Sequence, residues 1–181
     1  MTSCYQPLGA VEIRQAGAAD LPALGDLARR IWRAHYPAII GSAQTEYMLA
    51  QRYSTASLES AHTRGEIRFD LLHVDGEFVA FAGHAPGDEP GEWKLKQLYV
   101  LPEWQGRGLG ARLIRHVEQA AREAGAGTLV LTVNRGNKKA IDSYKRCGFT
   151  IRCAAEFDIG EGFRMEDFVM AKPLAAPALQ G

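Results

Sequence analysis

The sequence has few cysteines and no cluster of the residues that usually bind metals. Its 181 residues include three cysteines, Cys4, Cys147 and Cys153, and five scattered histidines. No C-x-x-C pair and no Cys/His group has the spacing of a zinc site, and an odd number of cysteines does not suit a disulfide framework. We therefore expect no metal, and reduced thiols of the kind found in cytoplasmic proteins.

An excess of charge of either sign is also missing. Lys and Arg together number 21, as do Asp and Glu, so the formal net charge is zero. A neutral chain lacks the basic surface that nucleic-acid binding needs, and it contains no polybasic helix that a membrane surface would attract. We expect neither nucleic acid nor a membrane as a partner.

Long apolar runs are absent too. No stretch approaches the roughly 20 residues of a membrane-spanning helix, and the N-terminus lacks the basic and apolar segments of a secretory signal. The length suits one domain. We expect a cytoplasmic protein with a single domain over residues 1–174 and a flexible C-terminal tail over residues 175–181.

The spacing of apolar residues predicts alternating strands and helices. The Asp75-Gly76 pair lies between two strand patterns and predicts a two-residue hairpin turn, because both positions need positive φ. The run TLVLTV at 128–133 is nearly all apolar, which suits a strand buried on both faces. The expected elements are a strand at 11–15, helices from Asp20, from Ser42 and near 57–63, strands at 67–74, 77–84 and 93–101, a helix at 107–124, a strand at 128–133, a helix at 138–147, and strands at 150–157 and 167–172. This order predicts an α/β fold, a mixed sheet with helices on both faces.

A glycine-rich segment lies between the strand at 93–101 and the helix that follows. Gly106, Gly108 and Gly110 fall within five residues, with Arg107 among them. Glycines let backbone N–H groups approach a ligand, and a helix N-terminus offers unpaired N–H donors to an anion. The segment therefore predicts a pyrophosphate-binding loop.

Two families of phosphate-binding loop fit the segment poorly. The P-loop needs a Lys-Ser or Lys-Thr pair after its glycines, and none follows here. Gly106-x-Gly108-x-x-Ala111 does fit the relaxed dinucleotide-binding pattern. However, residues 102–105 separate the glycines from the preceding strand, and the next strand ends at Asn134 where that fold has an acidic residue.

A third family fits better. Gln105-x-x-Gly108-x-Gly110 resembles the acetyl-CoA pyrophosphate loop, [RQ]-x-x-G-x-[GA], of the GNAT superfamily of N-acetyltransferases. The segment at 131–149 resembles the second motif of that family. The resemblance follows the order of elements over nearly the whole chain and is sharpest over 93–149. It implies a single GNAT-like α+β domain, with a mostly antiparallel sheet of about six to seven strands in which a splayed parallel pair holds CoA.

The resemblance also implies which residues bind acetyl-CoA, the acetyl donor. Loop amides would bind the pyrophosphate, and the strand before the loop would pair with the pantetheine arm. Asn137 would meet the same arm, although a plain helix N-cap is an equally good interpretation of it. The implied cofactor-binding residues are Leu98, Tyr99, Val100, Gln105, Gly106, Arg107, Gly108, Leu109, Gly110, Ala111, Asn137 and Tyr144.

Catalytic candidates follow from the same resemblance. Tyr144 would protonate the departing CoA thiolate, since a phenol can act as a general acid; alternatively it is only a core aromatic of its helix. Glu92, a carboxylate at the start of a strand, is the candidate base, although Lys94 stands where one branch of the family has its glutamate. His84 is the rival base, and each of the two can instead be a polar residue at a strand end.

The acceptor site in this fold lies between the first helices and the central strands. Its candidate substrate-binding residues are Trp32, Tyr36, Tyr47 and His84. The resemblance implies transfer of acetyl to a primary amine of a small molecule or a protein, by direct attack in a ternary complex, in a protein that can form a homodimer. The alternative is a non-catalytic acetyl-CoA-binding module or sensor.

Overall fold

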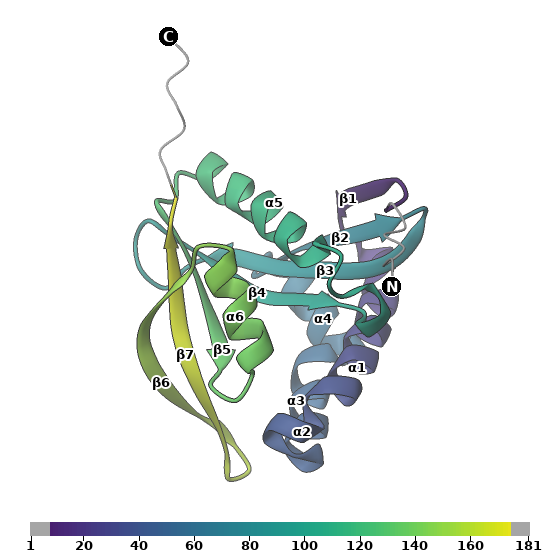
Figure 1. The fold of residues 1–181 in the computed structure, drawn as a ribbon. Coiled ribbons are helices and arrows are strands. Elements are labelled where there is room, and N and C mark those ends of the chain that lie inside the picture. The colour runs from purple at the N-terminus through teal and green to yellow at the C-terminus, as the bar shows by residue number, and fades with distance from the viewer. Residues whose placement is uncertain (1–7, 175–181) are drawn as a thin grey trace, which may run out of the picture.

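The computed structural model describes residues 8–174, so the predicted tail at 175–181 lies outside the described residues. Seven strands form one sheet in the order β1-β2-β3-β4-β5-β7-β6 (Figure 1). Every neighbouring pair is antiparallel except β4 and β5, which are parallel. The predicted mixed, mostly antiparallel sheet is therefore confirmed.

The elements follow the predicted order, with one short helix, α2, that the sequence analysis did not predict. The strands are β1 Val11–Gln15, β2 Arg68–Val74, β3 Glu77–Pro86, β4 Glu92–Val100, β5 Thr128–Asn134, β6 Thr150–Gly160 and β7 Phe163–Pro173. The helices are α1 Leu21–His35, α2 Pro37–Ile40, α3 Ser42–Tyr53, α4 Thr55–Thr63, α5 Leu109–Glu123 and α6 Lys138–Arg146. Short 3-10 turns lie at Ala18–Asp20 and Pro102–Trp104.

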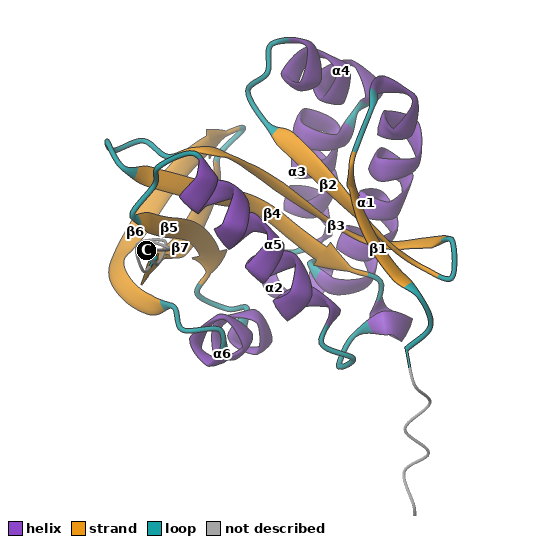
Figure 2. Cartoon of the chain, turned by 90° about the horizontal axis from the view of Figure 1, so that it is seen from above, coloured by secondary structure: helices purple, strands orange, loops and turns teal. Residues whose placement is uncertain are grey.

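Helices cover both faces of the sheet (Figure 2). Helices α1, α3 and α4 pack on one face, and α5 and α6 lie on the other. The central strand β3 is buried from Val79 to Ala85, because it lies between α1 and α5. Over residues 8–174, no helix is long and apolar enough to cross a membrane.

The hairpin turn is confirmed, whereas neither Asp20 nor Ser42, where two helices were expected to begin, caps its helix with a side chain. Asp75 and Gly76 have φ of 51° and 84°, as the hairpin requires. Asp20 makes no cap bond to α1, because its carboxylate accepts two hydrogen bonds from the Arg14 guanidinium at 2.7 and 2.8 Å, and the Arg14 bond lowers the pKa of Asp20 to about 2. Helix α3 is preceded by Gly41, at φ 80°, rather than capped by Ser42.

The parallel pair β4 and β5 separates part-way along its length. Their register runs from Glu92 opposite Thr128 to Leu95 opposite Leu131 and stops there. At the same point the β3–β4 register shifts by one residue, which leaves Lys96 as a bulge in β4. Bulges bend a strand, so β4 turns away from β5 and the sheet opens between them.

The bulge also decides which backbone groups face the opening. Leu101 N–H donates to the Val79 carbonyl at 3.0 Å. Antiparallel partners alternate between hydrogen-bonded and non-bonded pairs, so Tyr99 directs its backbone groups toward β3, whereas Leu98 and Val100 direct theirs toward β5. Within residues 8–174, no strand pairs with β4 on that side beyond Leu95.

Three side chains lie close to Gly83, next to this bulge. Gly83 is buried in β3 opposite Gln97, just before the register shift. A Cβ at Gly83 would come within 2.7 Å of Gln97 Oε1, 2.9 Å of Ile67 Cδ1 and 3.1 Å of Phe69 Cε1. A side chain at this position would force the side chains of Gln97, Ile67 and Phe69 to shift.

We expect Gly83→Ala to lower the free energy of unfolding by about 1–3 kcal/mol, the usual cost of overpacking a core. Chemical denaturation measures this. Gly127→Ala is the matched control, because a Cβ there meets nothing within 4 Å, and it should leave stability nearly unchanged. Equal stability of the two variants would mean that the space at Gly83 does not matter.

Candidate active site

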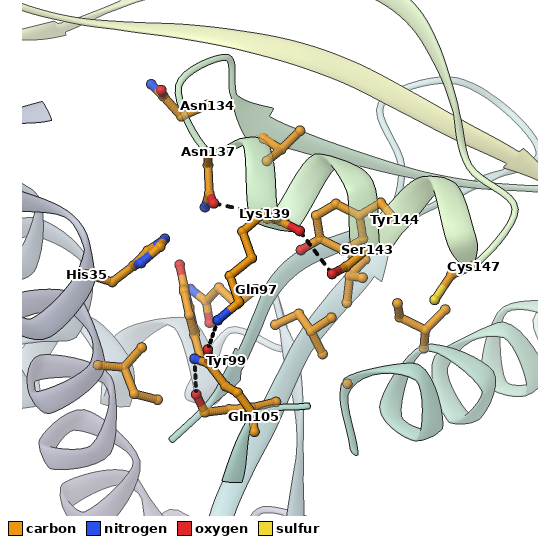
Figure 3. Close-up of a pocket in the computed structure, with 18 of the residues that line it drawn as sticks. His35, Gln97, Tyr99, Gln105, Asn134, Asn137, Lys139, Ser143, Tyr144 and Cys147 are labelled. Atoms are coloured by element: carbon orange, nitrogen blue, oxygen red, sulfur yellow. Dashed lines mark hydrogen bonds between the residues drawn. The ribbon is translucent and has the colours of Figure 1, made fainter. Parts of the chain in front are cut away.

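A cavity of about 520 Å³ follows the opening between β4 and β5. Residues of α1, α3, β4, β5, α5, α6 and β7 line it, together with the loop between β4 and α5 (Figure 3). The cavity therefore joins both faces of the sheet, with the α5–α6 face on one side and the α1–α3 face on the other. A reaction between two ligands that enter from opposite faces fits such a cavity.

The glycine-rich loop forms an anion-binding cradle at one end of the cavity. Gly106 and Gly108 have φ of 78° and 80°, values that side chains rarely tolerate, and a Cβ at either would meet nothing within 4 Å. No side chain caps α5, and its first backbone bond runs from Arg112 N–H to Gly108 O at 3.0 Å. The N–H groups of residues 108–111 thus have no intrahelical partner and can bind an anion such as a phosphate.

Gln105 connects this loop to both β4 and α6. Its side-chain amide donates to the Val100 carbonyl at 3.0 Å, and its oxygen accepts from Lys139 Nζ at 2.6 Å (Figure 3). Arg107 lies over the Trp104 ring, with its guanidinium carbon 4.7 Å from the centroid. These contacts hold the loop in place and put two cations beside the cradle.

Asn137 is the N-cap of α6, one of the two roles that the sequence analysis considered for it. It is buried at the start of α6, and its side-chain oxygen accepts from Ala140 N–H at 3.3 Å, so it is an N-cap. It also lines the cavity. The cap fixes the start of the helix that carries Tyr144.

Tyr144 faces the cavity from α6. Its ring packs edge-on against Phe149, with centroids 5.8 Å apart. Burial raises the pKa of the Tyr144 hydroxyl, and the nearby Tyr99 raises it further. A phenol carries its proton at neutral pH, with or without this shift, so Tyr144 has a proton that it can donate to a leaving group.

Aromatic rings form the wall on the α1 face. Trp32 stacks on Tyr36 with centroids 4.1 Å apart, and Tyr99 lies 6.1 Å from Trp32 across the opening. His35 packs edge-on against Tyr36. Trp32 and Tyr36 thus lie where the sequence analysis placed them, on the side opposite the cradle.

The structure does not bring three other predicted residues to the cavity. Glu92 lies at the closed end of the β4–β5 pair, where its carboxylate accepts from Arg152 at 2.6 Å. Its proposed role as the base needs correction for that reason. Tyr47 donates its hydroxyl hydrogen to the Ile159 carbonyl at 2.6 Å and so ties α3 to β6.

His84 is the third of these residues. It is completely buried, its Nδ1 accepts from Trp93 Nε1 at 2.8 Å, and its Nε2 lies 2.8 Å from Asp70 Oδ2. Both ring nitrogens are therefore engaged in the core, outside the cavity. The sequence could not reveal this, because Asp70 and Trp93 meet His84 only across neighbouring strands.

Asp167 is a site residue that the sequence analysis missed. It lines the cavity from β7 with 6% of its surface exposed, and its Oδ1 has no hydrogen-bond partner among the described residues. Burial raises the pKa of its carboxyl, against the opposite effect of Arg52 and Arg135. The signal that could have found it is its spacing from Met165. Residues two apart in a strand lie on the same face, so Asp167 is an acidic residue at a position of β7 where an apolar side chain is expected.

Comparison with known proteins identifies the architecture. The acetyltransferase (GNAT) family matches residues 26–149, more than half of the chain. The chain belongs to the GNAT family. Among residues 8–174 of this GNAT protein, no three His, Cys, Asp or Glu residues lie together so that they could hold a metal ion.

Relatives of this GNAT protein include enzymes with different acceptors. It is 33% identical over 98 residues to streptothricin acetyltransferase of Streptomyces lavendulae, a match that covers 54% of this chain and 51% of that enzyme. It is 26% identical over 160 residues to spermidine N(1)-acetyltransferase of Thermoplasma acidophilum, covering 86% of this chain and 96% of that one. The matched part thus spans about half the length of the streptothricin enzyme.

A solved structure shows the same fold. The PaiA N-acetyltransferase of Thermoplasma acidophilum in complex with coenzyme A superposes with a TM-score of 0.76 at 24% identity. The match covers 91% of this GNAT protein and 99% of the other chain. The seven-stranded sheet that opens between β4 and β5 is therefore the GNAT fold.

We expect Asp167→Asn to raise the melting temperature at pH 7 by about 2–4 °C, the equivalent of about 1 kcal/mol in a domain of this size. Because burial raises the folded-state pKa, the ionised carboxylate destabilises the folded protein at pH 7, and this penalty disappears once the pH falls below the unfolded value of about 4. Thermal melts at pH 7 and pH 4 measure the difference. A melting temperature that falls at pH 7 would show that the carboxylate is stabilised by its surroundings.

Proposed function

We propose that this protein is an acetyl-CoA-dependent N-acetyltransferase that acetylates a primary amine. The observation that carries the proposal is the opening between β4 and β5, which leads to the unpaired N–H groups at the start of α5. The opening suits an extended amide-containing chain, and the N–H groups suit a pyrophosphate. Acetyl-CoA contains both, and it supplies the thioester that is transferred.

The chain's own groups suit each part of the donor. The N–H groups of residues 108–111 would bind the pyrophosphate, with Arg107 nearby in the loop. The backbone groups of Leu98 and the N–H of Val100 would pair with the pantetheine amides, as an added strand pairs with a sheet edge. Gln105 already occupies the Val100 carbonyl, so it would position the loop rather than contact the donor through that bond.

Tyr144 would serve as the general acid. Its hydroxyl is protonated at neutral pH, as any phenol is, and its place on α6 puts it beside the opening. A protonated phenol near the departing sulfur stabilises the thiolate as the C–S bond breaks.

The acceptor would enter from the α1 face. Trp32, Tyr36 and His35 provide an aromatic wall there. The spermidine and streptothricin enzymes among its relatives suggest a small amine-bearing acceptor, and the amine of a peptide is the other class that the opening can receive.

Acetyl transfer tests the proposal. Wild-type protein is incubated with isotope-labelled acetyl-CoA and, separately, spermidine, streptothricin or a short peptide with a free N-terminal amine. We expect labelled product with at least one amine, and a rise in melting temperature with acetyl-CoA but not with NAD. At 100 times its Kd, a ligand adds about 2.7 kcal/mol. Stabilisation by acetyl-CoA without transfer to these amines or to amines of a cell extract would indicate a non-catalytic CoA-binding module instead.

We expect Tyr144→Phe to lower kcat about 100-fold, because general acid catalysis commonly contributes that much, while the melting shift with acetyl-CoA is retained. Tyr47→Phe is the matched control, since it removes a hydroxyl that lies outside the cavity, and it should keep kcat. Loss of acetyl-CoA binding in step with kcat would rule out the acid role.

A further inference from the structure

We propose that Asp167 binds the ammonium group of the acceptor and removes its proton, so that the enzyme selects amines that are cationic in solution. This inference rests on the proposed function. It also supplies a base in place of Glu92, whose ion pair with Arg152 lies at the closed end of β4.

Asp167 is built into the cavity rather than placed on its rim. The side chain lies on β7 beside Met165, and its Cα pairs with that of Asn134 in β5, one of the two strands that separate. It is more than nine-tenths buried, and its Oδ1 has no hydrogen-bond partner among residues 8–174. A buried carboxylate without a partner is costly, and a ligand that donates hydrogen bonds to it would remove that cost.

The charges around Asp167 point to a cationic ligand. It is the one acidic residue among the described residues that line the cavity, whereas the same lining includes Arg52, Lys96, Lys139 and Arg146. An ammonium group that enters the cavity therefore has one carboxylate available to it. Lys139 lies beside the glycine loop at the donor end, and Arg52 of α3 lies on the same side of the cavity as Asp167.

No neighbouring cation neutralises Asp167 directly. Its facing charged and titratable groups are Arg52 from α3, Arg135 from the loop after β5 and Tyr36 from α1. None of these is within ion-pair distance of it in the described part of the chain, and Arg135 binds Glu156 at 3.0 Å instead. The Asp167 carboxylate thus lies near cations but forms an ion pair with none of them in the described part of the chain.

The aromatic wall completes an ammonium site. Tyr36 lines the same cavity, and its ring is stacked with Trp32. Burial is the main cause of the raised pKa of the Tyr36 hydroxyl, and the charge of Asp167 adds to it. An ammonium group between a carboxylate and aromatic rings gains both a charge-assisted hydrogen bond and a cation–π interaction. Burial raises the pKa of the Asp167 carboxyl, which makes the group a stronger proton acceptor than a surface carboxylate.

The proton balance of the reaction follows from this placement. The carboxylate takes one proton from the ammonium group, and the neutral nitrogen then forms the C–N bond with the thioester carbonyl carbon. The C–S bond breaks, and the sulfur takes the hydroxyl proton of Tyr144. The nitrogen then gives a second proton, through water, to the Tyr144 phenolate, which restores the phenol. Asp167 releases to solvent the proton that it took from the ammonium group when the amide product leaves.

The test compares Asp167→Asn with wild-type protein, using whichever of spermidine, streptothricin and the peptide accepts acetyl fastest. At pH 7 we expect kcat/KM for the amine to fall about 10- to 100-fold, with an unchanged melting shift from acetyl-CoA. The ratio of wild-type to Asp167→Asn kcat/KM should become smaller as the pH is raised from 7 to 9.5. At the higher pH more of the amine is already neutral and needs no base. Asp167→Glu, which keeps the charge, should recover part of the activity.

The matched control is Glu166→Gln. Glu166 is the preceding residue of β7, exposed and outside the cavity, so its substitution should leave kcat/KM unchanged. If Asp167→Asn gives no folded protein, Asp167→Ser also removes the charge and carries the same comparison.

The inference is overturned if Asp167→Asn keeps the wild-type kcat/KM at pH 7, or if its loss is the same at pH 7 and pH 9.5, as a purely structural effect would be. In both cases wild-type transfer would stand, and the proposed function with it. If wild-type protein acetylates no amine, the proposed function fails first and the role of Asp167 fails with it.

Discussion

The end of parallel pairing between β4 and β5 is the constraint on which the site depends. Pairing stops after Leu95 and Leu131, at the same point where Lys96 bulges from β4. Backbone groups that lose a strand partner need another one. The bend therefore both creates the cavity and leaves Leu98 and Val100 with backbone groups directed into it. Gly83 lies beside the bend and leaves room for the side chain of Gln97.

The charges along the cavity divide it into two functional ends. At the α5–α6 end, Arg107 and Lys139 lie in and beside the loop that leads to the free N–H groups of α5. No acidic residue of the described chain lines that wall. At the other end, Asp167 lines the cavity together with Tyr36, Trp32 and Arg52. This polarity suits an anionic donor that enters on one face and a cationic acceptor that enters on the other. Tyr144 lies between the ends, where a leaving group would need a proton.

Much of this could be predicted from the sequence, because its signals are local. The hairpin at Asp75-Gly76, the order of strands and helices and the glycine loop each depend on neighbouring residues. Contacts between distant segments were not predictable in the same way. The resemblance suggested Glu92 as a base, because some family members keep a carboxylate near the start of this strand. However, β4 pairs with β5 at that end, and Arg152 reaches Glu92 from β6. Asp167 was missed because its burial depends on contacts with distant segments. Its spacing from Met165 places both side chains on one face of β7, but that spacing alone does not show that the face lines a cavity.

Backbone amide hydrogen exchange in β4, measured by NMR with and without acetyl-CoA, tests the central claim most directly. The account predicts that the amides of Leu98 and Val100 exchange more slowly when acetyl-CoA is bound, because the donor takes the place of the missing strand partner. The amide of Tyr99, which already bonds to β3, should change little. Unchanged exchange at Leu98 and Val100, in protein whose melting shift shows that acetyl-CoA is bound, would contradict the claim that the opening between β4 and β5 is the donor site.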